Sequence, residues 1–347
     1  MVSEAELQSI ESREIWDPEI PTLSSVLDQA TMRQCLRQVI CRRCDATEEI
    51  RFQILKHHPG SRCTLDIAFL TARGWDSLIG KVYAIDRPDV YHAMVAINQA
   101  GFQPEHLFSI PKPLAYIPDL RLLLQEKCQG RRAKEVFLTG NDGERTGAAE
   151  RCAEWLAEFH AMGPRSGGVL EATNHLQSVA RWSQRIANLG EPFPSMVGRL
   201  ARLLEDGAVT LKAARVCASH GSYNCNQIIL AERRTIVFDW DSYAIADPCR
   251  DVARFLVALQ RLGLKYRGSI RALDRAAEIF IETYEALNPC RVGENLLWYK
   301  ALTCLILAKY EAHRPVCTFR DGIEALISEG LRALGVRDTG YHGQVDR

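Results

Sequence analysis

The sequence of 347 residues carries 43 basic and 43 acidic side chains, so its formal net charge is zero. Hydrophobic residues make up 47% and charged residues 25%, which is the balance of a globular chain long enough for two lobes and a sizeable core. A neutral chain lacks the basic field that a nucleic-acid partner or an anionic membrane surface requires, and we therefore expect neither.

The N-terminal segment begins Met-Val-Ser-Glu-Ala-Glu, which lacks the basic start and apolar run of a secretion signal. No run approaches the roughly 18 apolar residues of a membrane span. These features predict a cytoplasmic protein. Its twelve cysteines show no repeated spacing, and in a reducing compartment we expect most of them to be buried thiols.

The one close cysteine pair is Cys41-Arg42-Arg43-Cys44. A zinc site normally needs two further ligands at matching spacing, and His57 and His58 are only loosely placed for that role. Two cysteines separated by two residues are a weak signal by themselves, so we assign this pair neither a metal nor a redox function.

Residues 1–49 are predicted to form an N-terminal helical extension. Thr22 or Ser24 could cap a helix whose apolar positions run from Val26 to Val39 at an approximate spacing of three and four. We interpret this segment as a structural helix pair that packs on the lobe that follows.

Residues 50–128 are predicted to form a strand-rich N-terminal lobe, in which Pro59-Gly60 makes a tight hairpin turn. Lys81 is a lone cation inside an apolar strand, where a charge needs a partner. Glu126 to Cys128 lie in a short polar segment that suits a hinge between lobes. The expected strands cover residues 52–55, 63–69, 78–84, 114–117 and 120–125, and the expected helix covers 89–100.

Residues 129–347 are predicted to form a helical C-terminal lobe. Gly and Pro separate its helices, and one of them carries Trp155 and His160, which we interpret as core residues. Arg131, Arg132 and Lys134 are read as a solvated rim. The expected helices cover residues 147–162, 174–189, 193–204, 269–287, 294–312 and 321–334, with a further apolar helical face at 252–259.

The most informative stretch runs from residue 218 to residue 256. Apolar runs at 228–230 and 236–238, separated by Glu232-Arg233-Arg234, predict two short strands of a hairpin. The polar loop that begins at His220 and the carboxylates of Asp239 and Asp241 would then lie close together. Such an arrangement of oxygen atoms can hold a metal and phosphates.

This stretch resembles the catalytic core of the aminoglycoside phosphotransferase-like family, the small-molecule relatives of protein kinases. The family pattern of His-Gly-Asp, four residues and Asn, followed by Asp-Phe/Trp-Asp, Gly-Asp-Pro and Asp-Leu-Ala, is matched in order and spacing. The matching residues are His220-Gly221, Asp239-Trp240-Asp241, Ala246-Asp247-Pro248 and Asp251-Val252-Ala253. The resemblance covers roughly residues 50–312 and implies an α+β, protein-kinase-like fold of two lobes.

The resemblance also implies the roles of the site residues. Lys81 would hold the α and β phosphates of ATP, and backbone groups from Glu126 to Cys128 would bind adenine. Asp239 would bind Mg²⁺. Two departures fall in the loop, because Ser222 occupies the position of the catalytic aspartate and Gln227 that of the metal-binding asparagine.

Because of these departures, the family pattern does not identify the residue whose carboxylate would orient the acceptor hydroxyl. Asp241 lies nearby in sequence and could orient a hydroxyl in place of Ser222, which is too weakly acidic to accept a proton unaided. His220 is interpreted as a brace of the loop, and Asp251 as a helix cap that could also hold the loop. The predicted helix at 89–100 has no glutamate to pair with Lys81, so Asp86, Asp89 or Glu105 could substitute, or the pair could be absent.

Two functions follow from the resemblance. The first is an ATP- and Mg²⁺-dependent phosphotransferase that acts on a hydroxyl of a small molecule. The second is a pseudokinase that binds nucleotide or a protein partner without phosphoryl transfer. From residue 151 onward no excess of acidic residues is present to attract a polycationic aminoglycoside, so the acceptor remains open.

Overall fold

The protein is described by a computed structural model that covers residues 17–39, 49–213, 215–287, 292–293, 295–313 and 319–336. The chain divides into two compact units, Met1–Val95 with Pro111–Cys128, and Ala96–Ile110 with Gln129–Arg347. Cys41 and Cys44 lie outside the described residues. The division into segments 1–49, 50–128 and 129–347 stays a proposal for the domain organisation.

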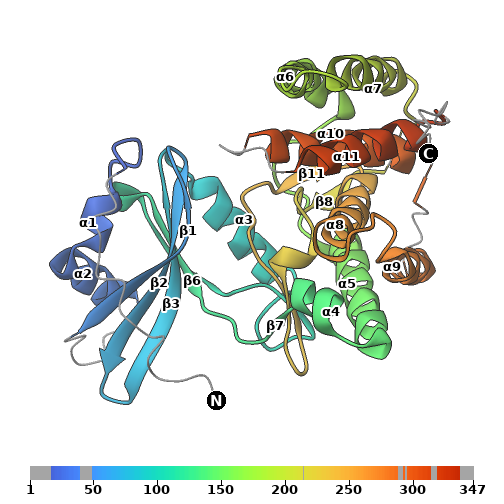
Figure 1. The fold of residues 1–347 in the computed structure, drawn as a ribbon. Helices are drawn as coiled ribbons and strands as arrows, with labels where there is room; N and C mark the ends of the chain where they lie inside the picture. The colour runs from blue at the N-terminus through green and yellow to red at the C-terminus, as the bar shows by residue number, and fades with distance from the viewer. Residues whose placement is uncertain are drawn as a thin grey trace, which may run out of the picture. The chain divides into compact units, whose positions relative to one another are not determined.

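The first unit is built on a five-stranded antiparallel sheet with the strand order β1-β2-β3-β6-β5 (Figure 1). The strands predicted in this region all form, and several are longer than predicted because the hairpin partners extend one another. In the register, Thr64 lies opposite Lys81 and Lys81 opposite Leu123. The strands are β1 (Ile50–His58), β2 (Arg62–Thr71), β3 (Gly74–Tyr83), β5 (Pro113–Ile117) and β6 (Leu122–Glu126).

Two short helices, α1 (Leu23–Leu27) and α2 (Gln29–Val39), pack against one face of this sheet (Figure 1). Their apolar side chains join the alternate buried side chains of the strands in one core. The predicted helix pair forms, and its two helices are separated at Asp28, whose carboxylate accepts a hydrogen bond from the Thr31 N–H at 2.8 Å. Thr22 makes no side-chain cap, because its hydroxyl donates to the Leu120 carbonyl at 2.8 Å.

The same alternation places polar residues on the other face of the sheet. Asp66, Lys81 and Gln125 are all buried, and each lies one residue out of phase with the apolar positions of its strand. This face of the sheet therefore carries three buried polar or charged side chains.

Helix α3 (Pro88–Gln99) follows the first three strands, as predicted, and the rest of the second unit is mainly helical. Helices α10 and α11 lie side by side (Figure 1). The helices of this unit are α4 (Ala133–Thr139), α5 (Asp142–Met162), α6 (Leu176–Ala187), α7 (Phe193–Ala208), α8 (Cys249–Arg267), α9 (Asp274–Leu287), α10 (Asn295–Ala312) and α11 (Arg320–Ala333).

Helix α4 was not expected, because the basic residues at its start suggested a solvated rim. The next helix, α5, begins five residues before its predicted start. A capping box accounts for this, in which the Asn141 side chain accepts from the Glu144 N–H at 2.9 Å and the Glu144 carboxylate accepts from the Asn141 N–H at 2.8 Å. Trp155 and His160 of α5 are buried, as predicted.

Short strands in the second unit hold the loop region. The predicted hairpin is confirmed as β9 (Ile228–Leu230) paired with β10 (Thr235–Val237), which extend a small sheet with β4 (Phe108–Ser109) and β7 (Arg131–Arg132). A second pair joins β8 (Cys217–Ser219) to β11 (Ala244–Ala246). Because β8 and β10 lead directly into the polar residues, these two small sheets set where the loop begins and ends.

An aromatic core lies beneath the loop. The Trp155 ring stacks on Phe159 and Tyr223, with centroids 5.1 and 5.9 Å apart, and the His220 ring lies 4.6 Å from the Trp240 ring. Rigid aromatic packing of this kind limits the conformations open to the loop above it.

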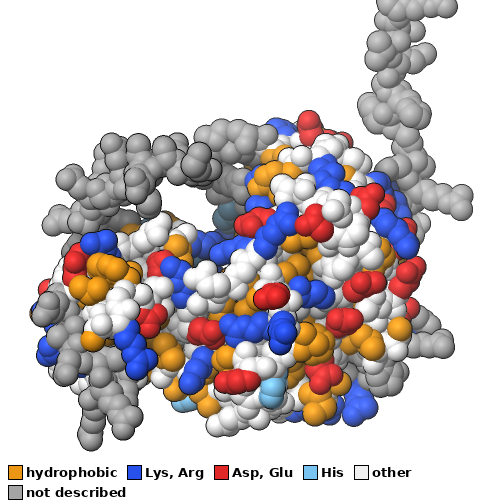
Figure 2. Space-filling view, turned by 90° about the horizontal axis from the view of Figure 1, so that it is seen from below, with side chains coloured by type: hydrophobic (Ala, Val, Ile, Leu, Met, Phe, Trp, Pro, Cys, Tyr) orange, Lys and Arg blue, Asp and Glu red, His pale blue; other side chains and the backbone are white. Residues whose placement is uncertain are grey.

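The molecular surface is mixed in charge. On the face shown in Figure 2, acidic and basic side chains are interspersed, in line with the zero net charge. The described cysteines are free thiols, and all of these except Cys128 are buried. Within the described ranges, no helix is both long and apolar enough to cross a membrane.

Candidate active site

His220 is the first residue of the loop after β8, and its side chain is completely buried. Burial lowers the pKa of His220 below its ordinary value, so the ring is neutral at pH 7. Its Nε2–H donates to the Phe238 carbonyl at 3.1 Å, which leaves Nδ1 to accept from the Ser222 N–H at 3.3 Å. A ring used in this way braces the loop between two strands and is a poor general base.

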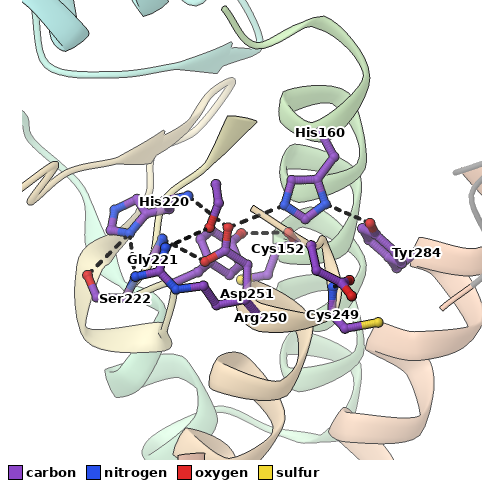
Figure 3. A network of polar contacts seen from close by, with 12 residues as sticks. Cys152, His160, His220, Gly221, Ser222, Cys249, Arg250, Asp251 and Tyr284 are labelled. Atoms are coloured by element: carbon purple, nitrogen blue, oxygen red, sulfur yellow. Dashed lines mark hydrogen bonds and ion pairs between the residues drawn. The ribbon is translucent and has the colours of Figure 1, made fainter. Parts of the chain in front are cut away.

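Asp251, in the first turn of α8, anchors the same loop from below (Figure 3). Its two oxygens accept hydrogen bonds from the backbone N–H groups of His220 and Gly221, both at 2.7 Å. One oxygen also lies 3.3 Å from Nε2 of His160, whose Nδ1 lies 2.6 Å from the Tyr284 hydroxyl. Asp251 therefore ties α5, α8 and the loop together.

Asp251 holds the loop, as the sequence allowed, but it does not supply the predicted helix cap. Asp247 provides that contact, since its carboxylate accepts from the Cys249 N–H at 2.8 Å. Burial raises the pKa of the Asp251 carboxyl, but the hydrogen bond and charge of His160 outweigh it, and the pKa is about 2. The group is thus a buried carboxylate whose lone pairs are taken by the loop and by His160.

Gly221 leaves the loop no room for a side chain. Its φ is +80°, and a Cβ atom there would lie 2.2 Å from the Ser242 carbonyl oxygen and 2.7 Å from an Arg250 guanidinium nitrogen. The Arg250 side chain thus lies directly beside the backbone that precedes Ser222, and it also donates to the Ser219 hydroxyl at 3.3 Å.

Ser222, Gln227 and Asp239 are brought together by side-chain contacts. The Gln227 amide nitrogen lies 3.1 Å from the Ser222 Oγ and 3.1 Å from an Asp239 carboxylate oxygen. Asn224 stabilises this arrangement, because its amide donates to the Gln227 Oε1 at 2.7 Å and to the Ser222 carbonyl at 2.6 Å. The residues at the three family positions therefore form one continuous polar cluster.

Asp239 adopts φ = +75°, a left-handed conformation that is uncommon for residues other than glycine. Strained backbone of this kind is found at functional sites, where the surrounding structure holds it in place. Asp241 follows in the turn toward β11 and is half-buried.

The donor set at Asp239 fits a magnesium ion that is shared with phosphates. Mg²⁺ is usually held by one or two protein oxygens, with phosphate oxygens and water completing the octahedron. Asp239 offers a carboxylate, and a half-turn of the Gln227 amide would present its carbonyl oxygen beside it. Among the described residues there is no cluster of three or more His, Cys, Asp or Glu that could hold a metal alone.

In the first unit, Lys81 is buried on the polar face of the sheet. Of its expected acidic partners, Asp86 accepts from the Tyr116 hydroxyl at 2.5 Å, and Asp89 pairs with Arg87 at 2.9 Å. Glu105 is exposed. Asp66 is on the same face of the sheet, two residues along β2 from the position opposite Lys81, and it pairs with Lys127 at 2.6 Å.

The hinge segment is anchored at Glu126, the last residue of β6. Its backbone N–H donates to the Lys112 carbonyl at 2.9 Å, and its carboxylate accepts from the Lys112 N–H at 3.0 Å. Cys128 is half-buried. These contacts hold the backbone of the segment in an extended form.

The hairpin turn at Gly60 is bound by a carboxylate from the N-terminal segment. Asp17 accepts from the Gly60 N–H at 3.0 Å and lies 2.8 Å from Nε2 of His57. The Gly60 amide of the predicted hairpin turn therefore has an anionic partner within the chain.

Three residues of these networks were missed from the sequence. Asn224 lacks a place in the family pattern, although an Asn two residues from Ser222 could have suggested a turn-forming side chain. Arg250 and Asp66 had no local signal, because their importance depends on contacts with segments far away in the sequence.

Comparison with known proteins supports the resemblance. The model of the phosphotransferase enzyme family matches residues 69–292. No curated protein sequence matches the chain.

Solved structures are similar over almost the whole chain. A choline/ethanolamine kinase family protein from Mesorhizobium loti is 15% identical with a TM-score of 0.58, covering 91% of this chain and 98% of its own. A putative aminoglycoside phosphotransferase from Ralstonia eutropha is 15% identical with a TM-score of 0.61, covering 89% and 98%. An aminoglycoside phosphotransferase in ternary complex with ADP and hygromycin B is 12% identical with a TM-score of 0.58, covering 87% and 97%. At these identities the likeness establishes the fold, which is the predicted α+β, protein-kinase-like one.

Proposed function

This chain belongs to the phosphotransferase enzyme family, and from that premise we propose that it transfers the γ-phosphoryl group of ATP to a hydroxyl of a small molecule. The observation that carries the proposal is the polar cluster of Ser222, Gln227 and Asp239, in which a strained aspartate lies beside an amide and a hydroxyl. A related protein bound to ADP supports a nucleotide as the donor.

The proposed roles follow the chemistry of phosphoryl transfer, which depends on positioning and on neutralising charge. Lys81 holds the α and β phosphates, and backbone groups from Glu126 to Cys128 bind adenine. Asp239 and Gln227 hold Mg²⁺, which supplies positive charge to the phosphates when it is bound. All of these residues bind or orient the donor.

At the acceptor side, Ser222 orients the substrate hydroxyl by hydrogen bonding. The acceptor oxygen forms a bond to the γ-phosphorus as the bond from that phosphorus to the bridging oxygen of ADP breaks. The hydroxyl proton passes to Asp241 or to water, because Ser222 cannot take it. Such a site would be slow, since general-base assistance contributes about 10²–10⁴-fold in rate.

A pseudokinase is the second candidate, and Ser222 is the observation that favours it. In this alternative the cluster binds nucleotide or only supports the fold, and the protein acts by binding a protein partner. In both cases we propose a cytoplasmic location.

The test is calorimetric titration of ATP, with and without Mg²⁺, into the wild type and Asp239→Ala. We expect binding that is strengthened by Mg²⁺ in the wild type and weakened at least tenfold in the variant, because the metal loses its carboxylate. Asp142→Asn, a change at a fully exposed carboxylate, is the control. If the wild type does not bind ATP, the enzyme proposal fails and a kinase-shaped binding protein remains.

A further inference from the structure

Five cations lie in the second unit on helices α6, α8 and α10, and within the described part of the chain none of them forms an ion pair with a carboxylate. Arg250 donates to the Ser219 hydroxyl and Arg181 to the Ser178 hydroxyl at 3.1 Å, and Arg185 lies 2.5 Å from Nε2 of His313. Lys309 lies over the rings of Trp182 and Tyr310, 5.0 and 3.9 Å from their centroids. The Nε of Arg254 is buried and has no hydrogen-bond partner.

These cations are close enough to disfavour one another's charge. Burial lowers the pKa of Lys309 to about 8, with the charges of Arg185, Arg254 and Arg181 adding to the effect. Burial likewise lowers the pKa of Arg254 to about 10, and Arg261 and Arg250 contribute. The charge of Asp251 offsets part of this effect at Arg250 and Arg254. Partly buried like charges that outnumber the carboxylates near them are still unfavourable unless something compensates them.

The acids nearest to this group are already engaged. Asp251 accepts from the loop backbone and lies beside His160, and Glu311 pairs with Arg261. A buried donor such as the Arg254 Nε requires an explanation, and an anion from outside the chain is the simplest partner for it.

Of the five cations, Arg250 lies nearest to the loop. Arg250 lies against Gly221, the residue before Ser222, and Arg254 is one turn further along α8. Lys309 of α10 and the α6 arginines continue from Arg254. A small molecule bound along this line would have one end beside Ser222 and the other among the cations.

We propose that the acceptor is a small hydroxylated molecule with an anionic group, a carboxylate or a phosphate, which Arg254, Lys309 and Arg185 bind while its hydroxyl lies near Ser222. The inference rests on the proposed function. Guanidinium groups bind both kinds of anion through paired hydrogen bonds. A cationic acceptor would be repelled by the same side chains.

The test uses four probes at matched ionic strength, titrated calorimetrically without nucleotide. D-Gluconate and D-ribose 5-phosphate are anionic, D-ribose is neutral and choline is cationic. We expect at least one anionic probe to bind at least tenfold more tightly than ribose and choline. Arg254→Gln and Lys309→Gln should each weaken that binding about tenfold or more, and Arg254→Lys should restore part of it.

Arg275→Gln is the matched control, because this exposed arginine on α9 pairs with Glu278 and lies outside the group. It should bind the anions like the wild type. Loss of an unpaired cation should leave the thermal midpoint of Arg254→Gln at or above that of the wild type, so folding is checked independently of binding.

The outcomes separate this inference from the proposed function. Tight choline binding, equal binding of ribose, or no binding of either anionic probe overturns the anionic acceptor, whatever the ATP titration shows. Anion binding that is lost in Arg254→Gln supports it. If the wild type binds an anionic probe but no ATP, the anion site stands and the phosphotransferase proposal falls.

Discussion

Ser222→Asp is expected to raise the rate of phosphoryl transfer by roughly 10²–10⁴-fold, because it introduces the carboxylate that can orient the acceptor hydroxyl and take its proton. The position suits the change. Ser222 is half-buried, its backbone is held by His220, and its Oγ lies 3.1 Å from the Gln227 amide nitrogen, which could donate to the new carboxylate. The measurement is ADP formation with D-gluconate and D-ribose 5-phosphate as acceptors.

Ser222→Asn is the control for this gain, since it has the size of Asp without its charge. A comparable gain in both variants would mean that side-chain size rather than a base limits the reaction. If neither variant forms product although ATP binds, the pseudokinase alternative is favoured. Where Ser222→Asp is active, Asp241→Asn is added to that variant. An unchanged rate of phosphoryl transfer would mean that Asp241 takes no part in proton transfer.

Asp251→Ala is expected to reduce the free energy of unfolding by about 3–5 kcal/mol, because removal of a buried carboxylate leaves its partners uncompensated. Two backbone N–H groups of the loop and the His160 ring would lose their acceptor. Asp251→Asn should also be destabilising, since an amide cannot accept from all three. Urea unfolding followed by circular dichroism measures the change, and Asp142→Asn should leave the midpoint unchanged.

The same carboxylate predicts an acid limit to stability. Its pKa falls from an ordinary 3.8 to about 2 in the folded protein, so the unfolded chain binds the proton first as the pH falls. Ionised Asp251 contributes on the order of 2 kcal/mol to the free energy of unfolding. This contribution is complete above about pH 4 and is lost between about pH 4 and pH 2. Unfolding measured across this range should show a smaller dependence on pH in Asp251→Asn, and an equal dependence would assign the acid limit to other groups.

Histidines should make a separate contribution at higher pH. Burial, with the charge of Arg250, lowers the pKa of His175 from 6.5 to about 4, so stability should decline as the pH falls from 6.5 toward 4. The buried His220 shifts in the same direction. Because Asp251→Asn leaves His175 in place, this higher window should persist in the variant.

Local sequence patterns determined most of the elements and the fold class. Alternation of apolar residues placed β2 and β3, and apolar spacing placed the helix that became α8. The motifs from His220 to Asp251 carried the resemblance to the family, which the family model confirms over residues 69–292. Boundaries were less accurate where one contact decides them, as at Asp28 and at the Asn141 capping box.

Only the tertiary structure decided how the polar residues are used. From the sequence, Asp251 was a helix cap that could also hold the loop, and Arg250 carried no signal. Folding places both against the loop backbone. The unpaired cations of α6, α8 and α10 are spread over more than a hundred residues of the chain, from Arg181 to Lys309, and no local pattern relates them. Secondary structure depends on neighbours in sequence, whereas burial, charge pairing and its absence depend on which segments the core brings together.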